Sequence, residues 1–242
     1  MGDAKRTLVL FPGAWGNKNK KYVAWWFRHV IAFFSDWNVV ILHYKGTSLK
    51  GYINNAHIDL SLLPSGCYAI GFSMGAQVAR GVAAKQPGLF KKVALFGGME
   101  RRGIRIAVLI HGLMIAFAPL MRVLWGKDLE LDTDQQIDAM LLGGTNPDRR
   151  ATLREQIKRA LHPEPCGAVR QISMPPLRLW MPPLPCEVMA IVPEKDFFVA
   201  HATYPGERVK IVRVAGDHSL IASESFHRVQ PSLERIKRWF NE

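Results

Sequence analysis

Short, mostly apolar runs recur along the chain, separated by glycine or proline, and they constrain its fold more than any other feature. The runs are Leu8–Phe11, Val39–His43, Cys67–Gly71, Lys92–Phe96, Cys186–Val192 and Val209–Val214. They do not alternate apolar with polar residues, as strands with one face in solvent do. Such runs are typical of strands buried on both faces of a parallel sheet.

Helical patterns lie between these runs. Tyr22–Phe34 is rich in aromatic residues, Gly75–Lys85 has apolar residues at helical spacing, and Pro231–Phe240 is predicted to close the chain as an amphipathic helix. Strands that alternate with helices pack as layers around one sheet. The sequence therefore predicts an α/β fold with a doubly wound, mostly parallel sheet.

The segment between residues 99 and 185 interrupts this alternation. Its apolar stretch Ile106–Met121 is shorter than the roughly 20 residues of a transmembrane helix, so membrane contact is not expected. We expect a helical cap, or lid, at 99–185, inserted into a core made of 1–98 and 186–242. A chain of 242 residues fits one α/β domain of this kind.

The chain is basic, with 32 Lys and Arg against 20 Asp and Glu and a net charge of +12. An excess of this size favours acidic partners or substrates. No helix-turn-helix, zinc-finger or RNA-binding signature accompanies it, so nucleic acid is not an expected partner. Three cysteines without C-x-x-C spacing indicate reduced thiols, and the apolar run near the amino terminus is too short for a signal peptide. These features predict a cytoplasmic protein.

The segment Gly71-Phe72-Ser73-Met74-Gly75 matches the pattern G-x-S-x-G, between a predicted strand and a predicted helix. A serine on such a sharp turn holds its hydroxyl above the sheet edge, and the flanking glycines avoid collision with the neighbouring strand and helix. Serine also caps helices, which is the structural alternative for Ser73. The position between strand and helix favours a nucleophile.

A nucleophilic serine needs a base and a group that orients the base. Asp196 follows the strand that contains Val188–Val192, and His218 follows the strand Val209–Val214. Both therefore come after the carboxyl end of a strand, where open α/β sheets place their sites. We predict Ser73 as nucleophile, His218 as base and Asp196 as orienting acid.

Other residues compete for these roles. Glu194 is an alternative acid, and Asp217 is a weaker one because its side chain is expected to point away from the adjacent imidazole. His201 and His227 are alternative bases, although neither follows a strand end. No histidine pairs with Cys or another His at metal-ligand spacing, so neither a metal nor another cofactor is expected.

Together these motifs resemble the α/β-hydrolase superfamily over essentially the whole chain, with 99–185 in the place of the family's variable cap. The residues that carry the resemblance are Phe11-Pro12-Gly13-Ala14-Trp15-Gly16, Gly71–Gly75, Asp196 and Gly216-Asp217-His218. The resemblance implies a serine hydrolase with the three roles assigned above. The family's usual His-Gly after the first strand is here Pro12-Gly13, which leaves the register of that loop open.

Two backbone N–H groups are expected to form an oxyanion hole, the site that binds the negative oxygen of the reaction intermediate. One belongs to Met74, at the amino end of the helix after the nucleophile. The other belongs to Ala14, which matches the position after the family's His-Gly, or to Trp15 if the loop is one residue longer. Trp15, Phe117 and Arg122 are predicted to contact the substrate.

The substrate is the least constrained part of the prediction. Lys18, Lys20 and Lys21 follow the oxyanion loop, and a basic rim there suits an acidic acyl carrier protein that delivers an acyl ester. The chain is similar in length and plan to the pimeloyl-carrier methyl-ester esterases, a specific candidate. The alternatives are a small-ester carboxylesterase or lipase-like enzyme, and a catalytically silent binding protein on the same fold.

Overall fold

The computed structural model describes residues 5–13, 20–45, 48–98, 150–152, 154–155, 184–196, 209–222 and 225–242. The predicted cap, 99–185, lies outside the described residues except for a few positions, and so its helical structure stays a prediction. Among the helices that are described, none combines the length and the apolar character that crossing a membrane requires.

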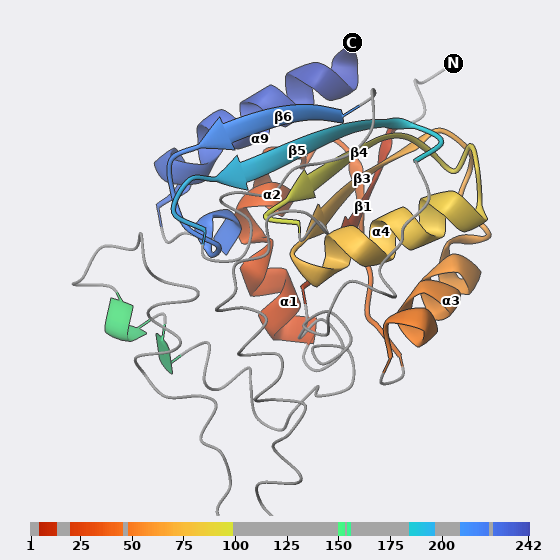
Figure 1. Ribbon diagram of the computed structural model, residues 1–242, viewed down its shortest axis with the longest axis horizontal. Coiled ribbons are helices and arrows are strands. Elements are labelled where there is room, and N and C mark those ends of the chain that lie inside the picture. Colours follow the sequence, from red (N-terminus) through yellow and green to blue (C-terminus); the bar gives the residue numbers. More distant parts are fainter. Residues whose placement is uncertain are drawn as a thin grey trace, which may run out of the picture.

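The described residues form a core with a six-stranded sheet. The strands of this sheet run parallel, as Figure 1 shows. Its order across the sheet is β2-β1-β3-β4-β5-β6. The strands are β1 (Thr7–Phe11), β2 (Asn38–Ile41), β3 (Cys67–Phe72), β4 (Phe90–Phe96), β5 (Glu187–Pro193) and β6 (Val209–Val214). The α/β class and the parallel sheet predicted from the apolar runs are confirmed.

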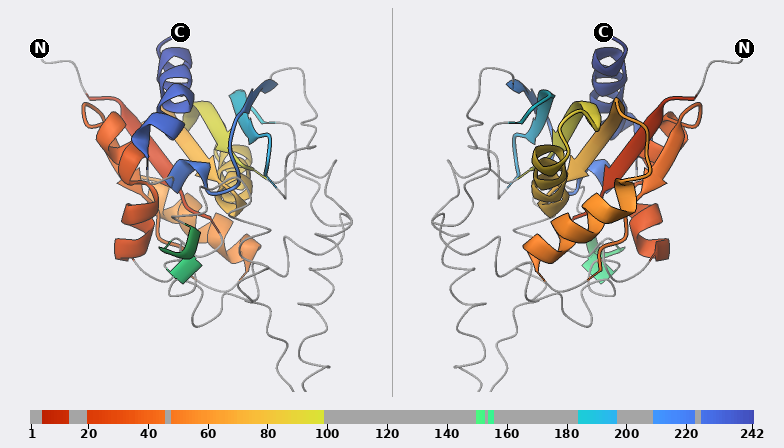
Figure 2. Two further views of the ribbon diagram at one scale, coloured as in Figure 1. Left: turned by 90° about the vertical axis from the view of Figure 1, so that its left-hand side faces the viewer. Right: turned by 90° about the vertical axis from the view of Figure 1, so that its right-hand side faces the viewer.

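Helices cover both faces of this sheet (Figures 1 and 2). On one face, α3 (Leu49–Leu60) and α4 (Met74–Lys85) share an apolar core with the sheet. On the other, α1 (Lys20–Trp26), α2 (Arg28–Phe33) and α9 (Phe226–Asn241) pack apolar residues against the strands, with Trp26, Val30 and Phe240 buried. The order of the sheet reverses between β1 and β3, and the carboxyl ends of strands at such a point are where open α/β sheets place their sites.

The predicted single helix Tyr22–Phe34 is divided at Phe27 into α1 and α2. Helical hydrogen bonds continue across the division, from Phe27 N to Val23 O at 3.2 Å and from Ile31 N to Phe27 O at 2.9 Å. The Arg28 guanidinium donates to the Trp25 carbonyl at 2.9 Å. In a continuous helix this carbonyl accepts from the backbone N–H four residues later, so the Arg28 side chain competes with that hydrogen bond. The helical segment therefore begins two residues before the predicted start and ends one residue before the predicted end, and it is divided at Phe27.

The carboxy-terminal helix begins earlier than predicted, because α9 includes five residues before Pro231. Proline favours the first helical turn, which placed the expected start at Pro231 itself. The preceding turn forms because Val229 is wholly buried and Phe226 packs against the Phe33 ring at 6.2 Å. Burial thus outweighs the hydrogen bond that the proline nitrogen cannot make.

Truncation of Phe240 tests how much the packing of α9 on the sheet contributes to the free energy of unfolding. The Phe240 ring is wholly buried. The ring centroid lies 4.9 Å from that of Tyr68 in β3 and 6.2 Å from that of Phe34. We expect Phe240→Ala to lower the free energy of unfolding by about 3–5 kcal/mol, since it leaves a cavity between helix and sheet. Urea unfolding followed by circular dichroism measures the change.

The control is Leu62→Ala, because the Leu62 side chain is 94% exposed. An exposed truncation should change the free energy of unfolding by less than about 0.5 kcal/mol. Equal effects of the two variants would contradict the packing described for α9.

Candidate active site

Ser73 occupies a sharp turn between β3 and α4. It has φ 52° and ψ −121°, and it is the only residue other than glycine with positive φ in the part of the chain that the structure describes. Backbone in such a region costs about 1–3 kcal/mol and persists only where the surroundings impose it. Tight packing of the neighbouring glycines supplies that constraint here.

Glycine is required on both sides of Ser73 because backbone packs against backbone. A Cβ atom at Gly75 would lie 2.0 Å from the Phe11 carbonyl oxygen, and one at Gly71 would lie 2.7 Å from the Ala76 Cα. Neither contact is possible for real side chains. The two glycines of the G-x-S-x-G pattern therefore let α4 begin directly over the end of β1.

The Ser73 side chain does not cap the helix, although Ser73 stands at the N-cap position of α4. Its hydroxyl instead lies 2.9 Å from Nε2 of His218. The serine is partly exposed, whereas His218 is only 3% exposed. The structural alternative, a helix-capping serine, is thus wrong for the side chain.

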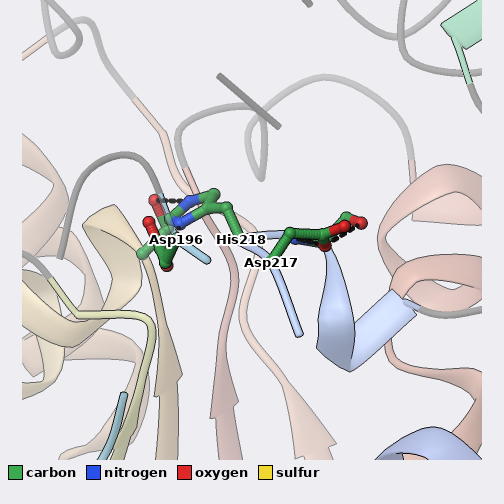
Figure 3. Close-up of polar contacts among 5 residues, drawn as sticks. Asp196, Asp217 and His218 are labelled. Atoms are coloured by element: carbon green, nitrogen blue, oxygen red, sulfur yellow. Dashed lines mark hydrogen bonds and ion pairs between the residues drawn. The ribbon is translucent and has the colours of Figure 1, made fainter. Parts of the chain in front are cut away.

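His218 follows β6 and is held by a second contact on its other ring nitrogen. Nδ1 lies 2.8 Å from Oδ2 of Asp196, whose side chain is wholly buried, and Figure 3 shows the two residues joined. The Phe72 ring packs on the imidazole with centroids 5.1 Å apart. Ser73, His218 and Asp196, which we call the triad, thus form one hydrogen-bonded series.

Asp196 lies three residues after the end of β5, in a segment that is tied to the loop carrying His218. Glu194 N donates to Val214 O at 2.9 Å, and Lys195 N donates to Gly216 O at 2.9 Å. These backbone bonds extend the pairing of β5 with β6 as far as the site. The Glu194 side chain is exposed, so of the two candidate acids the structure brings Asp196 to the imidazole.

Asp217 points away from the imidazole, as its sequence position led us to expect, and Figure 3 shows the two side chains diverging. Its buried carboxylate accepts hydrogen bonds from the Ser219 backbone N–H at 2.9 Å and the Ser219 hydroxyl at 2.6 Å. Asp217 therefore shapes the turn into the short 3₁₀ helix Leu220–Ala222 that follows His218. That helix is also fixed by Arg28, which donates to the Ala222 carbonyl at 3.0 Å.

Gly97 is a site residue that the sequence analysis did not single out. It follows β4 with φ +56°, and a Cβ atom there would lie 3.2 Å from Asp196 Oδ2 and 3.4 Å from His218 Nδ1. The bare Cα thus makes room for the contact between acid and imidazole. The available signal was the pair Gly97-Gly98, which directly follows an apolar strand.

The loop after β1 approaches the triad through Gly13. A Cβ atom on Gly13 would lie 3.5 Å from the Ser73 Cβ, so this backbone runs directly beside the serine. Ala14 and Trp15, the two predicted oxyanion donors of this loop, lie outside the described residues. Met74 is the first residue of α4, and its N–H is one of the helix-end donors that have no partner within a helix.

The other predicted contacts are placed as follows. Phe117, Arg122, Lys18 and the alternative base His201 lie outside the described residues, while His227 is exposed on α9. Lys20 and Lys21 are exposed at the start of α1. Within the described ranges, no three His, Cys, Asp or Glu side chains are grouped so that they could hold a metal ion.

Solved structures with the same architecture identify the fold. The chain is similar to a lipase-esterase related protein from Clostridium acetobutylicum, with 19% identity, a TM-score of 0.67, and 98% of this chain and 95% of that chain covered. It is similar to an extracellular alpha/beta-hydrolase from a Paenibacillus species, with 13% identity, a TM-score of 0.63, and 95% and 97% covered.

A third similar structure is the naproxen esterase, carboxylesterase NP, from Bacillus subtilis, with 14% identity, a TM-score of 0.61, and 98% and 84% covered. No protein-family model and no curated protein sequence matches the chain. At these identities the likeness establishes the fold, and the chain has the α/β-hydrolase fold.

Gly97→Ala tests how closely the backbone supports the triad. The added methyl group presses on Asp196 and His218, which must shift by a few tenths of an ångström. Because a misplacement of about 1 Å can cost about 10²-fold, we expect this smaller shift to slow the reaction of Ser73 with a fluorophosphonate probe by about tenfold. The rate of labelling, followed by gel fluorescence, measures the effect.

The matched control is Gly88→Ala. Gly88 has φ +88°, so alanine meets a similar backbone penalty there, but nothing lies within 4 Å of the added Cβ. This variant should lose about 1–2 kcal/mol of stability and label at the wild-type rate below its melting temperature. Equal labelling of both variants would show that Gly97 does not act through the triad.

Proposed function

We propose that the chain is a serine hydrolase that cleaves a carboxylic ester or thioester through an acyl-enzyme intermediate. The observation that carries the proposal is the bonding of His218, with Nε2 2.9 Å from the Ser73 hydroxyl and Nδ1 2.8 Å from the buried Asp196 carboxylate. A neutral imidazole in this position accepts the serine proton as the hydroxyl attacks a carbonyl. Esterases among the solved structures with this fold support the same conclusion.

The proposed reaction begins when Ser73 Oγ attacks the carbonyl carbon and its proton passes to His218 Nε2. Asp196 remains ionised, accepts the hydrogen bond from Nδ1–H and stabilises the imidazolium that forms. The negative oxygen of the tetrahedral intermediate accepts hydrogen bonds from Met74 N–H and from the second donor predicted at Ala14 or Trp15. Such donors typically contribute about 10²–10³ in rate.

The intermediate collapses when the bond to the alcohol or thiol breaks, and His218 returns its proton to that leaving group. The acyl group is then esterified to Ser73. Water enters, His218 takes a proton from it, and the hydroxide attacks the acyl carbonyl through a second tetrahedral intermediate. Release of the carboxylic acid returns the proton to Ser73 Oγ, so the residues finish in their starting states.

The strained turn at Ser73 fits this role. A serine whose only task was structural would have no need of φ 52°, because helix N-caps ordinarily adopt extended backbone. The turn instead directs the hydroxyl to the imidazole and leaves the first N–H groups of α4 close to the same point. Strain of this kind is characteristic of functional sites.

For the substrate, we propose an acyl ester, either free or linked to a carrier protein. Lys20 and Lys21 are exposed at the start of α1, and the chain carries a net charge of +12. Both features favour an acidic carrier, as in the pimeloyl-carrier methyl-ester esterases, while a small neutral ester needs neither. The two substrate classes differ in their response to salt.

Ser73→Ala and Asp196→Asn test the proposed chemistry. The first removes the nucleophile, and the second removes the charge that orients His218. Asp196→Asn should lower the rate of p-nitrophenyl butyrate hydrolysis by about 10⁴-fold. Ser73→Ala should lower it by about 10⁶-fold and abolish fluorophosphonate labelling. Wild-type protein that labels no faster than Ser73→Ala would identify a silent binding protein instead.

The matched control for the acid is Glu194→Gln. Glu194 lies two residues from Asp196 with its side chain exposed, so loss of its charge should leave the rate within about twofold of wild type. A large loss in this variant would transfer the orienting role from Asp196 to Glu194.

Salt dependence separates the substrate classes. Hydrolysis of p-nitrophenyl butyrate and of a methyl ester of an acyl carrier protein is measured at ~0.05 M and ~0.5 M sodium chloride, where screening lengths differ about threefold. A carrier substrate predicts a steep fall in kcat/KM for the carrier ester alone. Turnover of the small ester, with no activity on the carrier ester at either salt concentration, would identify a small-ester carboxylesterase.

A further inference from the structure

Tyr44 places a buried hydroxyl on the loop that runs beside Ser73. The residue follows β2 and is 4% exposed, and its hydroxyl donates to the Pro12 carbonyl oxygen at 2.8 Å. Pro12 and Gly13 are the residues that stand where relatives of this fold are expected to have His-Gly. Tyr44 thus bonds to the first peptide of the predicted oxyanion loop.

The Tyr44 side chain is fixed by its neighbours. Its ring stacks on the Tyr52 ring of α3, with centroids 4.8 Å apart and planes at 17°. Burial raises the pKa of the Tyr44 phenol well above its ordinary value, and so the hydroxyl remains a proton donor throughout the physiological range. The Pro12 carbonyl therefore has a rigid and permanently protonated partner.

The Pro12–Gly13 peptide is held from the opposite side by the nucleophile turn. The Pro12 oxygen would lie 2.4 Å from a Cβ atom on Gly75, which means that it packs directly on the Gly75 backbone. Gly13 in turn lies against Phe72 and Ser73, since a Cβ atom added at Gly13 would lie 3.1 Å from the Phe72 ring. The peptide is clamped between Tyr44 and the turn that carries Ser73.

We propose that Tyr44 is a positioning residue for the oxyanion loop, because its hydrogen bond to Pro12 sets the orientation of the backbone that continues past Ser73. The carbonyl and N–H of a trans peptide point in opposite directions, so anchoring the Pro12 oxygen also fixes the direction of the Gly13 N–H. Gly13 directly precedes Ala14 and Trp15, the residues predicted to carry the second donor, so the fixed Pro12–Gly13 peptide is the point from which that part of the loop starts. This inference rests on the proposed hydrolase function.

The expected effect is on the chemical step. Removal of the hydroxyl leaves the buried Pro12 carbonyl without this donor, and the loop relaxes to recover a partner. Loss of an entire oxyanion donor lowers rates by about 10²–10³, and a displaced donor retains part of its effect. We therefore expect about a tenfold loss of kcat with little change in KM, because binding of the ground-state ester does not depend on the oxyanion donors.

The experiment compares Tyr44→Phe with Tyr52→Phe on p-nitrophenyl butyrate. Tyr44→Phe keeps the stacked ring and removes only the hydroxyl bonded to Pro12. Tyr52→Phe removes the hydroxyl of the other ring in the same stack and leaves the bond to Pro12 in place. Rates are normalised to active sites titrated with a fluorophosphonate, so that any misfolded fraction is not counted.

A second measurement reports the oxyanion hole directly. Ser73 Oγ adds to the carbonyl carbon of an alkyl trifluoromethyl ketone, and the product is a negatively charged tetrahedral adduct. In Tyr44→Phe its inhibition constant should rise by the same factor by which kcat/KM falls, and in Tyr52→Phe it should stay within about twofold of wild type. Replacement of Tyr44 by p-aminophenylalanine restores a donor at the same position and should recover most of kcat.

The outcomes are separable. Unchanged kcat and inhibition constant in Tyr44→Phe, or equal losses in both variants, would overturn the role of Tyr44 while the hydrolase function stands. A rise in KM alone would make Tyr44 a substrate contact instead. Wild-type protein that neither labels nor turns over any ester would overturn the proposed function, and with it this inference.

Discussion

The site depends on one contact, in which the backbone of α4 rests directly on the backbone at the end of β1. Gly75 lies so close to the carbonyl oxygens of Phe11 and Pro12 that any side chain there would overlap them. This contact sets the height of α4 above the sheet and imposes the strained conformation of Ser73. It also joins Ser73 to the Pro12–Gly13 peptide, which precedes one of the predicted oxyanion donors, so the same packing positions both segments.

Much of this arrangement could be predicted from the sequence, because the features that determine it are local. Apolar runs mark strands buried on both faces, as β3 and β5 are. Val209–Val214 was predicted with the boundaries that β6 has, but the expectation that it is buried on both faces was wrong, because Lys210 and Arg213 are exposed. The G-x-S-x-G pattern needs only a strand before it and a helix after it. Asp196 and His218 could be found because each closely follows a strand, and parallel strands bring their carboxyl ends to one edge of the sheet.

The parts that were missed depend on contacts between distant segments. Helix α3 was not predicted, although Ser48 caps it and Tyr52, Ala56 and Leu60 are buried at helical spacing, because Gly51, Asn54 and Asn55 weaken its helical propensity. The role of Gly97 depends on the positions of Asp196 and His218, which are distant in sequence. The bond from Tyr44 to Pro12 likewise needs the pairing of β1 with β2, and the predicted cap at 99–185 stays a prediction.

Strand β6 carries His218 and lies at the edge of the sheet, where β5 is its only neighbour among the described strands. The side chains of Lys210, Ile211 and Arg213 are exposed. Strand β6 therefore buries less side-chain surface than the inner strands of the sheet do. Edge elements open at a lower free energy than the core does. Heating or mild denaturant should therefore separate His218 from Ser73 before the sheet itself unfolds, and loss of the proposed activity by local opening would precede global unfolding.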